Sequence, residues 1–281
     1  MPLTTRHMEA MHIARTAGAF AREFFAHRHF MAAGHSHASD FADRTFGAIR
    51  TVMKTRLAAA FPGDAVIDES VVVASHLTLD RGWIIDPISG RRNFLRGIPF
   101  YAVALAYLEE DRCQLGVVYD PEHDELFHVR RTAGAACEHA GTDTRLEVAH
   151  CDTLDGALIC VAQDERPPES GHLAVHHELQ DLGSTVRAMG APALELAHVA
   201  AGRCDGFVGL NVDPHHLCAG ALLVEEAGGY TLRPAFAEGA RAGTPLIGSA
   251  PGIAGPLTDG ANLVLGHRRA ETLPALLTRI H

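Results

Sequence analysis

The stretch that decides the fold is residues 82–94, which read Gly82-Trp83-Ile84-Ile85-Asp86-Pro87-Ile88-Ser89-Gly90-Arg91-Arg92-Asn93-Phe94. Its apolar first part is typical of a buried β-strand that delivers the Asp86 carboxylate at its end. Pro87 cannot donate to a sheet ladder, so we expect the strand to stop there, and Gly90 permits a tight turn into a helical turn. A helix N-terminus offers free N–H groups to an anion such as phosphate, although an ordinary strand and turn would read the same way.

The chain before and after this stretch predicts an α+β half over residues 1–150. Apolar residues recur at helical spacing over 8–30 and 44–60, and Pro62-Gly63 ends the second helix. Four short β-branched or aromatic segments, separated by charged turns, then predict antiparallel strands: 83–85, 101–107, 114–119 and 125–129.

From residue 151 to 281 the pattern changes to alternating strands and helices, which is typical of an α/β half. Strands are expected at 157–162 and 206–210, and helices at 171–182, 193–201, 217–227 and 270–279. No repeat or linker separates the halves, so we expect one rigid body of α/β class.

Three further segments follow the same order as a set of family signatures. Residues 62–70 are similar to a segment ending in G-E-E-S, residues 190–206 to G-S-A-A-L-x-L-x-x-V-A-A-G-x-x-D-G, and residues 219–229 to a small-residue helix ending in E-A-G-G after a W-D pair. Residues 86–94 resemble D-P-[ILV]-D-G-T-x-N-F. From about Met8 to Ile247, the chain thus resembles the inositol-monophosphatase-like family.

The resemblance implies a layered αβαβα sandwich of the inositol-monophosphatase/fructose-bisphosphatase type. It also implies a Mg²⁺-dependent phosphomonoesterase acting on inositol phosphates, sugar phosphates or 3′-phosphonucleotides. Because the family is often dimeric, a homodimer is expected. In such enzymes two metal ions bridge the phosphate and activate water, and magnesium requires several hard oxygen ligands.

Most of the family's metal-binding residues are replaced in this chain. Ser89 stands for the second signature Asp and Arg91 for the following Thr. The other positions carry His215 and His216 for the W-D pair, Asp68 and Glu69 for the two Glu of G-E-E-S, Phe46 for the Asp of T-x-x-D, and Gly209 for a substrate-binding acid. Asp86 alone is unchanged among the direct ligands.

Charge accounting predicts that the usual magnesium site is lost. Asp68, Glu69 and Asp86 would hold at most one divalent ion, and Arg91 adds a positive charge to the same turn. Two unit charges 4 Å apart interact by ~4 kcal/mol at an effective dielectric of 20, and a divalent ion doubles that repulsion.

Three functions remain open. The first is binding of a phosphorylated or otherwise anionic small metabolite without metal, through Gly90, Arg91, Arg92 and Gly190. The candidate catalytic groups of this site are Asp86, Ser89 and His216. Both arginines have the alternative of a surface ion pair, which is favoured for Arg92. The second is a divergent phosphomonoesterase for inositol or sugar phosphates with one metal on Asp68, Glu69 and Asp86, either Mg²⁺ or, with His216, Zn²⁺, Mn²⁺ or Fe²⁺. The third is a non-catalytic dimeric scaffold or regulator.

Composition and charge limit the possible ligands and the expected location of the protein. The formal net charge of -10 argues against a nucleic-acid ligand, and no apolar run is long enough to span a membrane. The N-terminal residues lack the apolar block of a signal peptide, so a cytoplasmic location is expected. The six cysteines show no metal or disulfide spacing and are expected to be reduced. Lys54, the single lysine, carries no functional expectation.

Overall fold

The structure is a computed structural model that describes residues 2–31, 35–68, 81–110, 112–163, 171–210, 214–232 and 246–261. At 28–31, 35–40, 163, 171 and 214–216 the description covers the backbone alone. The expected helix at 270–279 lies outside these residues.

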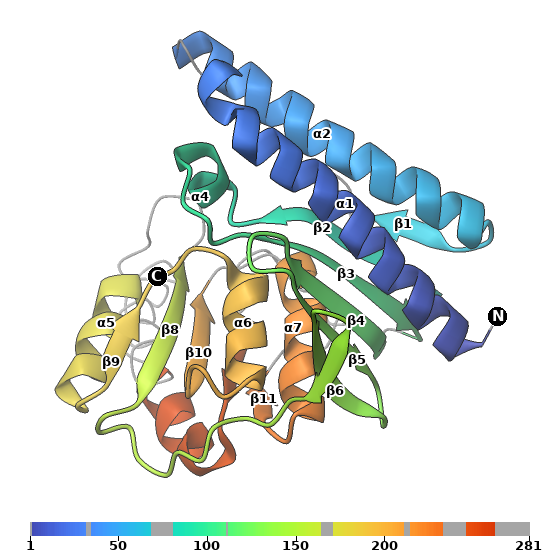
Figure 1. The fold of residues 1–281 in the computed structure, drawn as a ribbon. Helices are drawn as coiled ribbons and strands as arrows, with labels where there is room; N and C mark the ends of the chain where they lie inside the picture. The colour runs from blue at the N-terminus through green and yellow to red at the C-terminus, as the bar shows by residue number, and fades with distance from the viewer. Residues whose placement is uncertain are drawn as a thin grey trace, which may run out of the picture.

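Two long helices form the first layer (Figure 1). Helices α1 (Leu3–Met31) and α2 (His35–Ala60) lie on one face of the larger sheet and bury a common apolar core against it. Both helices are confirmed, and both begin earlier than predicted, because polar first turns, residues 3–7 in α1 and the His- and Ala-containing residues from His35 in α2, extend them toward the N-terminus.

The second layer is a seven-stranded sheet in the order β1-β2-β3-β4-β5-β6-β7. Strand β1 pairs parallel to β2, and all later neighbours pair antiparallel. The sequence predicts four of these strands and misses β1 and the last two, of which β7 is fully exposed and polar. The strands are β1 (Ala65–Ile67), β2 (Arg81–Ser89), β3 (Ala102–Glu109), β4 (Arg112–Asp120), β5 (Glu125–Arg130), β6 (Gly134–His139) and β7 (Thr142–Arg145).

Two helices separate this sheet from a second one. Helices α6 (Pro192–Ala200) and α7 (Pro214–Glu226) lie between the sheets, where residues of both halves of the chain share one core. The second sheet has the order β11-β12-β10-β8-β9. Its strands are β8 (Leu158–Gln163), β9 (Thr185–Arg187), β10 (Gly206–Leu210), β11 (Tyr230–Leu232) and β12 (Leu246–Ser249).

The outer layer contains α5 (Gly171–Asp181) and the helical residues 251–261, which cover the far face of the second sheet. The layers therefore follow the expected αβαβα order. No helix in the described part of the chain is long and apolar enough to cross a membrane.

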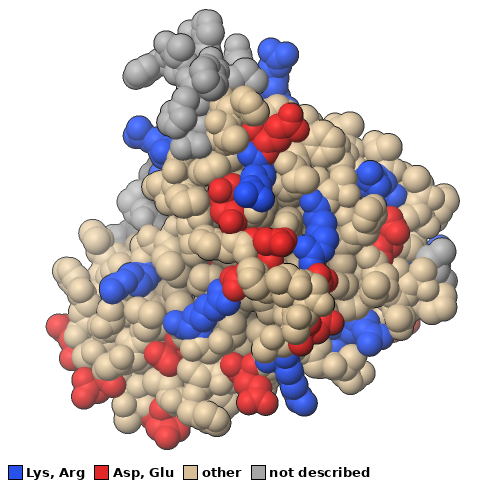
Figure 2. Space-filling model, in the orientation of Figure 1, with Lys and Arg blue, Asp and Glu red and all other residues tan. Residues whose placement is uncertain are grey.

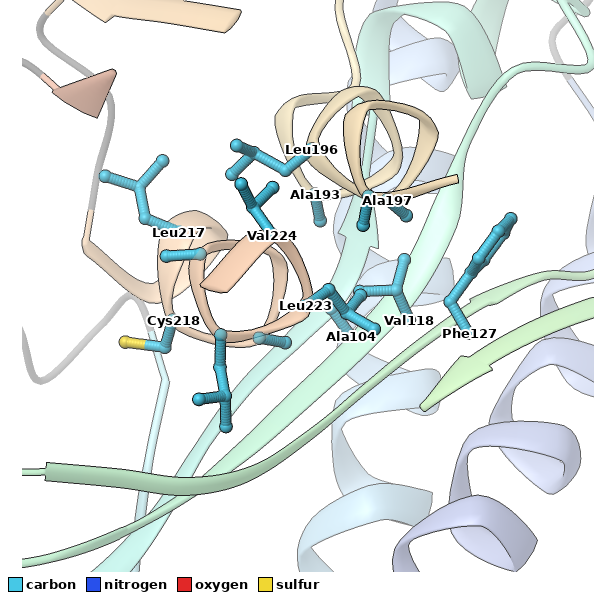
Figure 3. Packing of buried hydrophobic residues seen from close by; sticks show 14 of the residues in the cluster. Ala104, Val118, Phe127, Ala193, Leu196, Ala197, Leu217, Cys218, Leu223 and Val224 are labelled. Atoms are coloured by element: carbon cyan, nitrogen blue, oxygen red, sulfur yellow. The ribbon is translucent and has the colours of Figure 1, made fainter. Parts of the chain in front are cut away.

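Small residues bring the central layer close to both neighbours. A Cβ on Gly116 of β4 would lie 2.8 Å from Ala219 Cα of α7, and a Cβ on Gly220 would lie 2.6 Å from Leu196 Cβ of α6. Figure 3 shows α6 and α7 side by side, with Leu223 directed toward the large sheet. Larger side chains at these glycines would push the layers apart.

The end of α7 is fixed by its E-A-G-G residues. Gly228 adopts φ +87°, which ends the helix. The N–H of Gly229 then donates to Val224 O at 2.9 Å. Glu226 accepts backbone N–H groups from Thr132 (2.8 Å) and Gly134 (3.0 Å). In this chain the motif therefore joins α7 to the turn between β5 and β6.

Candidate functional site

Strand β2 carries the decisive stretch, and it does not end at Pro87. The strand continues to Ser89, with a register shift between Asp86 and Ser89 in its pairing with β3. The expectation that Pro87 stops the strand is wrong, because the irregular pairing accommodates the missing N–H. The expected helical turn after Gly90 is confirmed as α4 (Arg91–Arg96).

Asp86 is fully buried and faces the central helices. Its pairing partner on β3 is Ala104, which belongs to the core between the two sheets. Opposite residues of an antiparallel pair share a face of the sheet, so the Asp86 carboxylate lies on the α7 side.

Asp68 directly follows β1 and lies against α2. Ile67, the last residue of β1, pairs with Ile84 of β2. The fully buried Asp68 carboxylate is 2.6 Å from Lys54 Nζ and 3.4 Å from Arg50 Nε, both on α2. The ion pairs place Asp68 beside α2, and the metal set of Asp68, Glu69 and Asp86 stays a prediction. Glu69 lies outside the described residues.

Lys54 and Arg50 are residues whose importance the sequence reasoning missed. They stand four residues apart on α2, and Phe46 precedes Arg50 by another four, so the three share one stripe of the helix. That spacing was a usable signal. The ion pairs with Asp68 join the middle of α2 to the end of β1.

Two of the replaced family positions touch each other. The Arg91 guanidinium carbon lies 5.1 Å from the centre of the Phe46 ring, within the range of a cation–π contact. Phe46 is itself buried and packs edge-on against Phe94 of α4, with ring centres 5.7 Å apart. Arg91 is half-buried and Arg92 is exposed, so the neighbouring arginines occupy different environments.

The turn at Gly90 requires glycine. Its φ is +97°, and a Cβ there would lie 3.0 Å from Phe100 O and from Ala191 Cβ. Next to it, the fully buried Ser89 hydroxyl accepts the N–H of Ala193 at 3.2 Å. Ser89 thus joins the turn to the first residues of α6.

A side-chain amide completes this junction. Asn93 Nδ2 donates to Phe100 O (2.8 Å) and to Met189 O (2.7 Å). Gly190, with φ +78°, lies directly beside the Asn93 amide. The structure therefore brings together Ser89 and Gly90 with Gly190, as the family resemblance implies.

Glu195 is a buried acid that the sequence reasoning did not select. Its side chain is fully buried in the first turn of α6, and Oε1 accepts the N–H of Ala191 at 3.2 Å. Burial raises the pKa of Glu195 to about 7, although backbone N–H groups of Ala191, Gly190 and Met189 act in the opposite direction. Among the described residues, Oε2 has no hydrogen-bond partner.

The histidine pair lies in the first turn of α7. His215 and His216 follow Pro214, the first residue of the helix, so their backbone is at its N-terminal end between the sheets. Their side chains are not among those described, and the role of His216 stays a prediction.

The described residues do not fit a magnesium site. Of the expected ligands whose side chains the structure describes, Asp86 lies on the α7 side of β2 and Asp68 is paired with two cations of α2. The described part of the chain holds no group of three or more His, Cys, Asp or Glu side chains suited to a metal ion. Magnesium requires a near-octahedral set of oxygen ligands, which the described side chains do not assemble by themselves; Glu69 and the side chain of His216 lie outside them.

Comparisons with known proteins agree with the architecture. The sequence profile of the inositol monophosphatase family matches residues 4–261. The chain is 30% identical over 222 residues to the Nus factor SuhB of Escherichia coli K12, covering 78% of this chain and 82% of that protein. It is 31% identical over 226 residues to the Nus factor SuhB of Pseudomonas aeruginosa, with the same coverage.

Solved structures show the same similarity. The SuhB structure from Mycobacterium tuberculosis superposes with a TM-score of 0.80 at 26% identity, covering 93% of this chain and 97% of that chain. The inositol monophosphatase from Anabaena superposes with a TM-score of 0.77 at 26% identity, covering 92% and 95%.

Proposed function

Because the chain belongs to the inositol monophosphatase family, we propose that it is a member without the usual magnesium site, and that it binds a small phosphorylated or otherwise anionic metabolite. The ligand lies at the junction of the Gly90 turn, the Gly190 segment and the start of α7. Positively charged side chains, Arg91 and protonated His216, bind the anion in place of the metal ions used by the family. A homodimer and a cytoplasmic location belong to the same proposal.

The observation that carries this proposal is the contact between Arg91 and Phe46. These are two positions where the family resemblance expects a Thr and an Asp, and in this chain they form a cation–π pair. A guanidinium that lies over an aromatic ring keeps its N–H groups directed outward in the guanidinium plane, where they suit the two oxygens of a phosphate or carboxylate. The exchange of an acid for an aromatic ring removes negative charge and supports a cation at the same point.

The neighbouring residues serve the ligand in different ways. Gly90 lets backbone approach the anion closely, because it has no side chain in the turn. Asp86 and Ser89 lie at the end of β2 as acceptor and hydroxyl, and His216 would contribute a second cation when protonated. Asp86, Ser89 and His216 are the groups available for any proton transfer.

A small molecule suits this protein better than a nucleic acid. The net charge is -10, and acidic and basic side chains are interspersed over the described part of the face shown in Figure 2. Binding to a phosphate backbone requires a continuous basic surface that displaces counterions.

The first test compares the two adjacent arginines. Inorganic phosphate or a sugar phosphate should raise the melting temperature of the wild-type protein, and Arg91→Ala should abolish that rise. Arg92→Ala is the matched control, because it removes the same charge from an exposed position. An equal loss in both variants would show that only general charge matters, and no rise in the wild type would remove the proposal.

The second test rebuilds the family signature. A Ser89→Asp/Arg91→Thr variant adds a carboxylate and removes a cation, so it should bind Mn²⁺ more tightly than the wild type, as measured by electron paramagnetic resonance. Stoichiometric, tight Mn²⁺ binding by the wild-type protein would contradict the loss of the metal site.

Two alternatives have their own results. Phosphate ester turnover that rises with Mg²⁺ and disappears in Asp86→Asn would support a divergent phosphomonoesterase with one metal ion. A folded protein that responds to no anion and turns over no ester would support a non-catalytic regulator, an idea favoured by the name Nus factor that its curated relatives carry.

A further inference from the structure

Two buried thiols meet where the second sheet joins α6. Cys160 lies on β8 and is fully buried, and Cys204 lies in the turn between α6 and β10 with 4% of its surface exposed. Their sulfur atoms are 3.3 Å apart, with the Cys160 thiol donating to Cys204 Sγ. All six cysteines are free thiols in the structure.

The backbone holds these sulfurs together. Asp205, next to Cys204, donates its N–H to Leu158 O at 2.9 Å and accepts the Leu158 N–H through Oδ2 at 2.7 Å. Its own carbonyl accepts the N–H of Ala250 at 2.9 Å. Both the backbone N–H and the side chain of Asp205 therefore bind the turn to Leu158 at the start of β8. The two thiols consequently have little freedom to separate.

We propose that Cys160 and Cys204 form a reversible disulfide when the protein meets a hydroperoxide. The sulfur atoms must approach by roughly 1.2 Å to reach the ~2.05 Å length of a disulfide bond. This site does not depend on the proposed anion-binding function.

The reaction balances in two steps. The Cys204 thiolate attacks one peroxide oxygen, the O–O bond breaks, and the leaving hydroxide takes a proton to form water, which leaves a sulfenic acid. The Cys160 sulfur then attacks the Cys204 sulfur, and the sulfenic OH leaves as a second water with the Cys160 proton. Two thiols are oxidised, one hydrogen peroxide is reduced to two waters, and a thiol reductant reverses the change.

The hydrogen bond assigns the two roles. The Cys160 S–H donates to Cys204 and thereby lowers the pKa of Cys204, whereas that hydrogen bond and burial raise the pKa of Cys160. Cys204 is also the more exposed of the two, with 4% of its surface accessible against 0% for Cys160, so we assign Cys204 as the attacking thiol and Cys160 as the resolving one. Because both are buried, the reaction requires local opening and should be slow compared with that of an exposed thiol.

The primary test uses the unmodified protein. The folded chain is treated with hydrogen peroxide, unreacted thiols are alkylated after unfolding, and peptides are mapped by mass spectrometry. We expect a linked peptide pair containing Cys160 and Cys204, with two of the six thiols lost and recovered after dithiothreitol. The proposal would be overturned if Cys160 and Cys204 were both fully alkylated while the partly exposed Cys151 was oxidised.

Variants test the assigned order. Cys160→Ser should abolish the link and leave a sulfenic acid at Cys204 that dimedone traps. Cys137→Ser removes another buried thiol and should keep the link. Sulfenic acid trapped mainly at Cys160 in a Cys204→Ser protein, with none at Cys204 in the reverse variant, would contradict the order of attack.

Discussion

At the scale of single residues, Glu195 shows how a buried charge escapes sequence reasoning. Its neighbours on α6 are Leu194 and Leu196, and the helix is apolar on nearly all sides. A lone carboxylate in such a helix has no solvent face, which was the available signal. Its carboxylate meets the Ala191 N–H at the start of α6, so it supports the segment that contains Gly190.

Glu195 should make stability depend on pH. Its ordinary pKa of 4.5 applies to the unfolded chain, and burial raises the folded value to about 7. Between these values the unfolded chain releases a proton that the folded chain keeps, so stability falls as pH rises, by up to about 3 kcal/mol above pH 7. Glu195→Gln should therefore gain stability relative to the wild type between pH 5 and pH 8.

Urea denaturation at the two pH values measures this gain. Each comparison is made between wild type and variant at the same pH, so the effect of altered packing in Glu195→Gln cancels in the difference. An equal difference at pH 5 and pH 8 would mean that Glu195 ionises as freely in the folded state as in the unfolded chain.

At the scale of elements, contacts between distant elements limit what a sequence can predict. Ser89, Gly90 and Gly190 come together because each lies at the end or just before the start of an element that a motif marks. Asp68 follows β1 and pairs with Arg50 and Lys54 of α2, and the signature blocks alone do not predict these ion pairs.

The end of α7 provides a prediction at this scale. Glu226 accepts two backbone N–H groups across the turn between β5 and β6, so Glu226→Ala leaves both without this acceptor. We expect a loss of roughly 1–3 kcal/mol in the free energy of unfolding, measured by urea denaturation. The exposed Glu147→Ala is the control with the same loss of charge, and comparable effects in both would show that the two hydrogen bonds contribute little.

At the scale of the whole molecule, the sequence predicts the layers better than their edges. The change from consecutive strands to strand–helix alternation near residue 151 predicts an α/β half packed on an α+β half, because each layer must bury an apolar face, and the family resemblance implies the αβαβα order. Strands β6 and β7 escape prediction because part of the edge they form faces water, and β7 has a fully exposed burial pattern. Pairing with a neighbour, rather than apolar periodicity, makes them strands.

The contact between Gly116 and Ala219 has a consequence for a ligand bound at the start of α7, where the proposed site lies. Since helix and strand backbones already touch there, α7 has no spare depth into which it could retreat. A ligand that is too large for the site cannot be accommodated by a movement of α7 toward β4. Under the proposed function, discrimination between anions would then fall to side chains such as Arg91 and not to movement of α7.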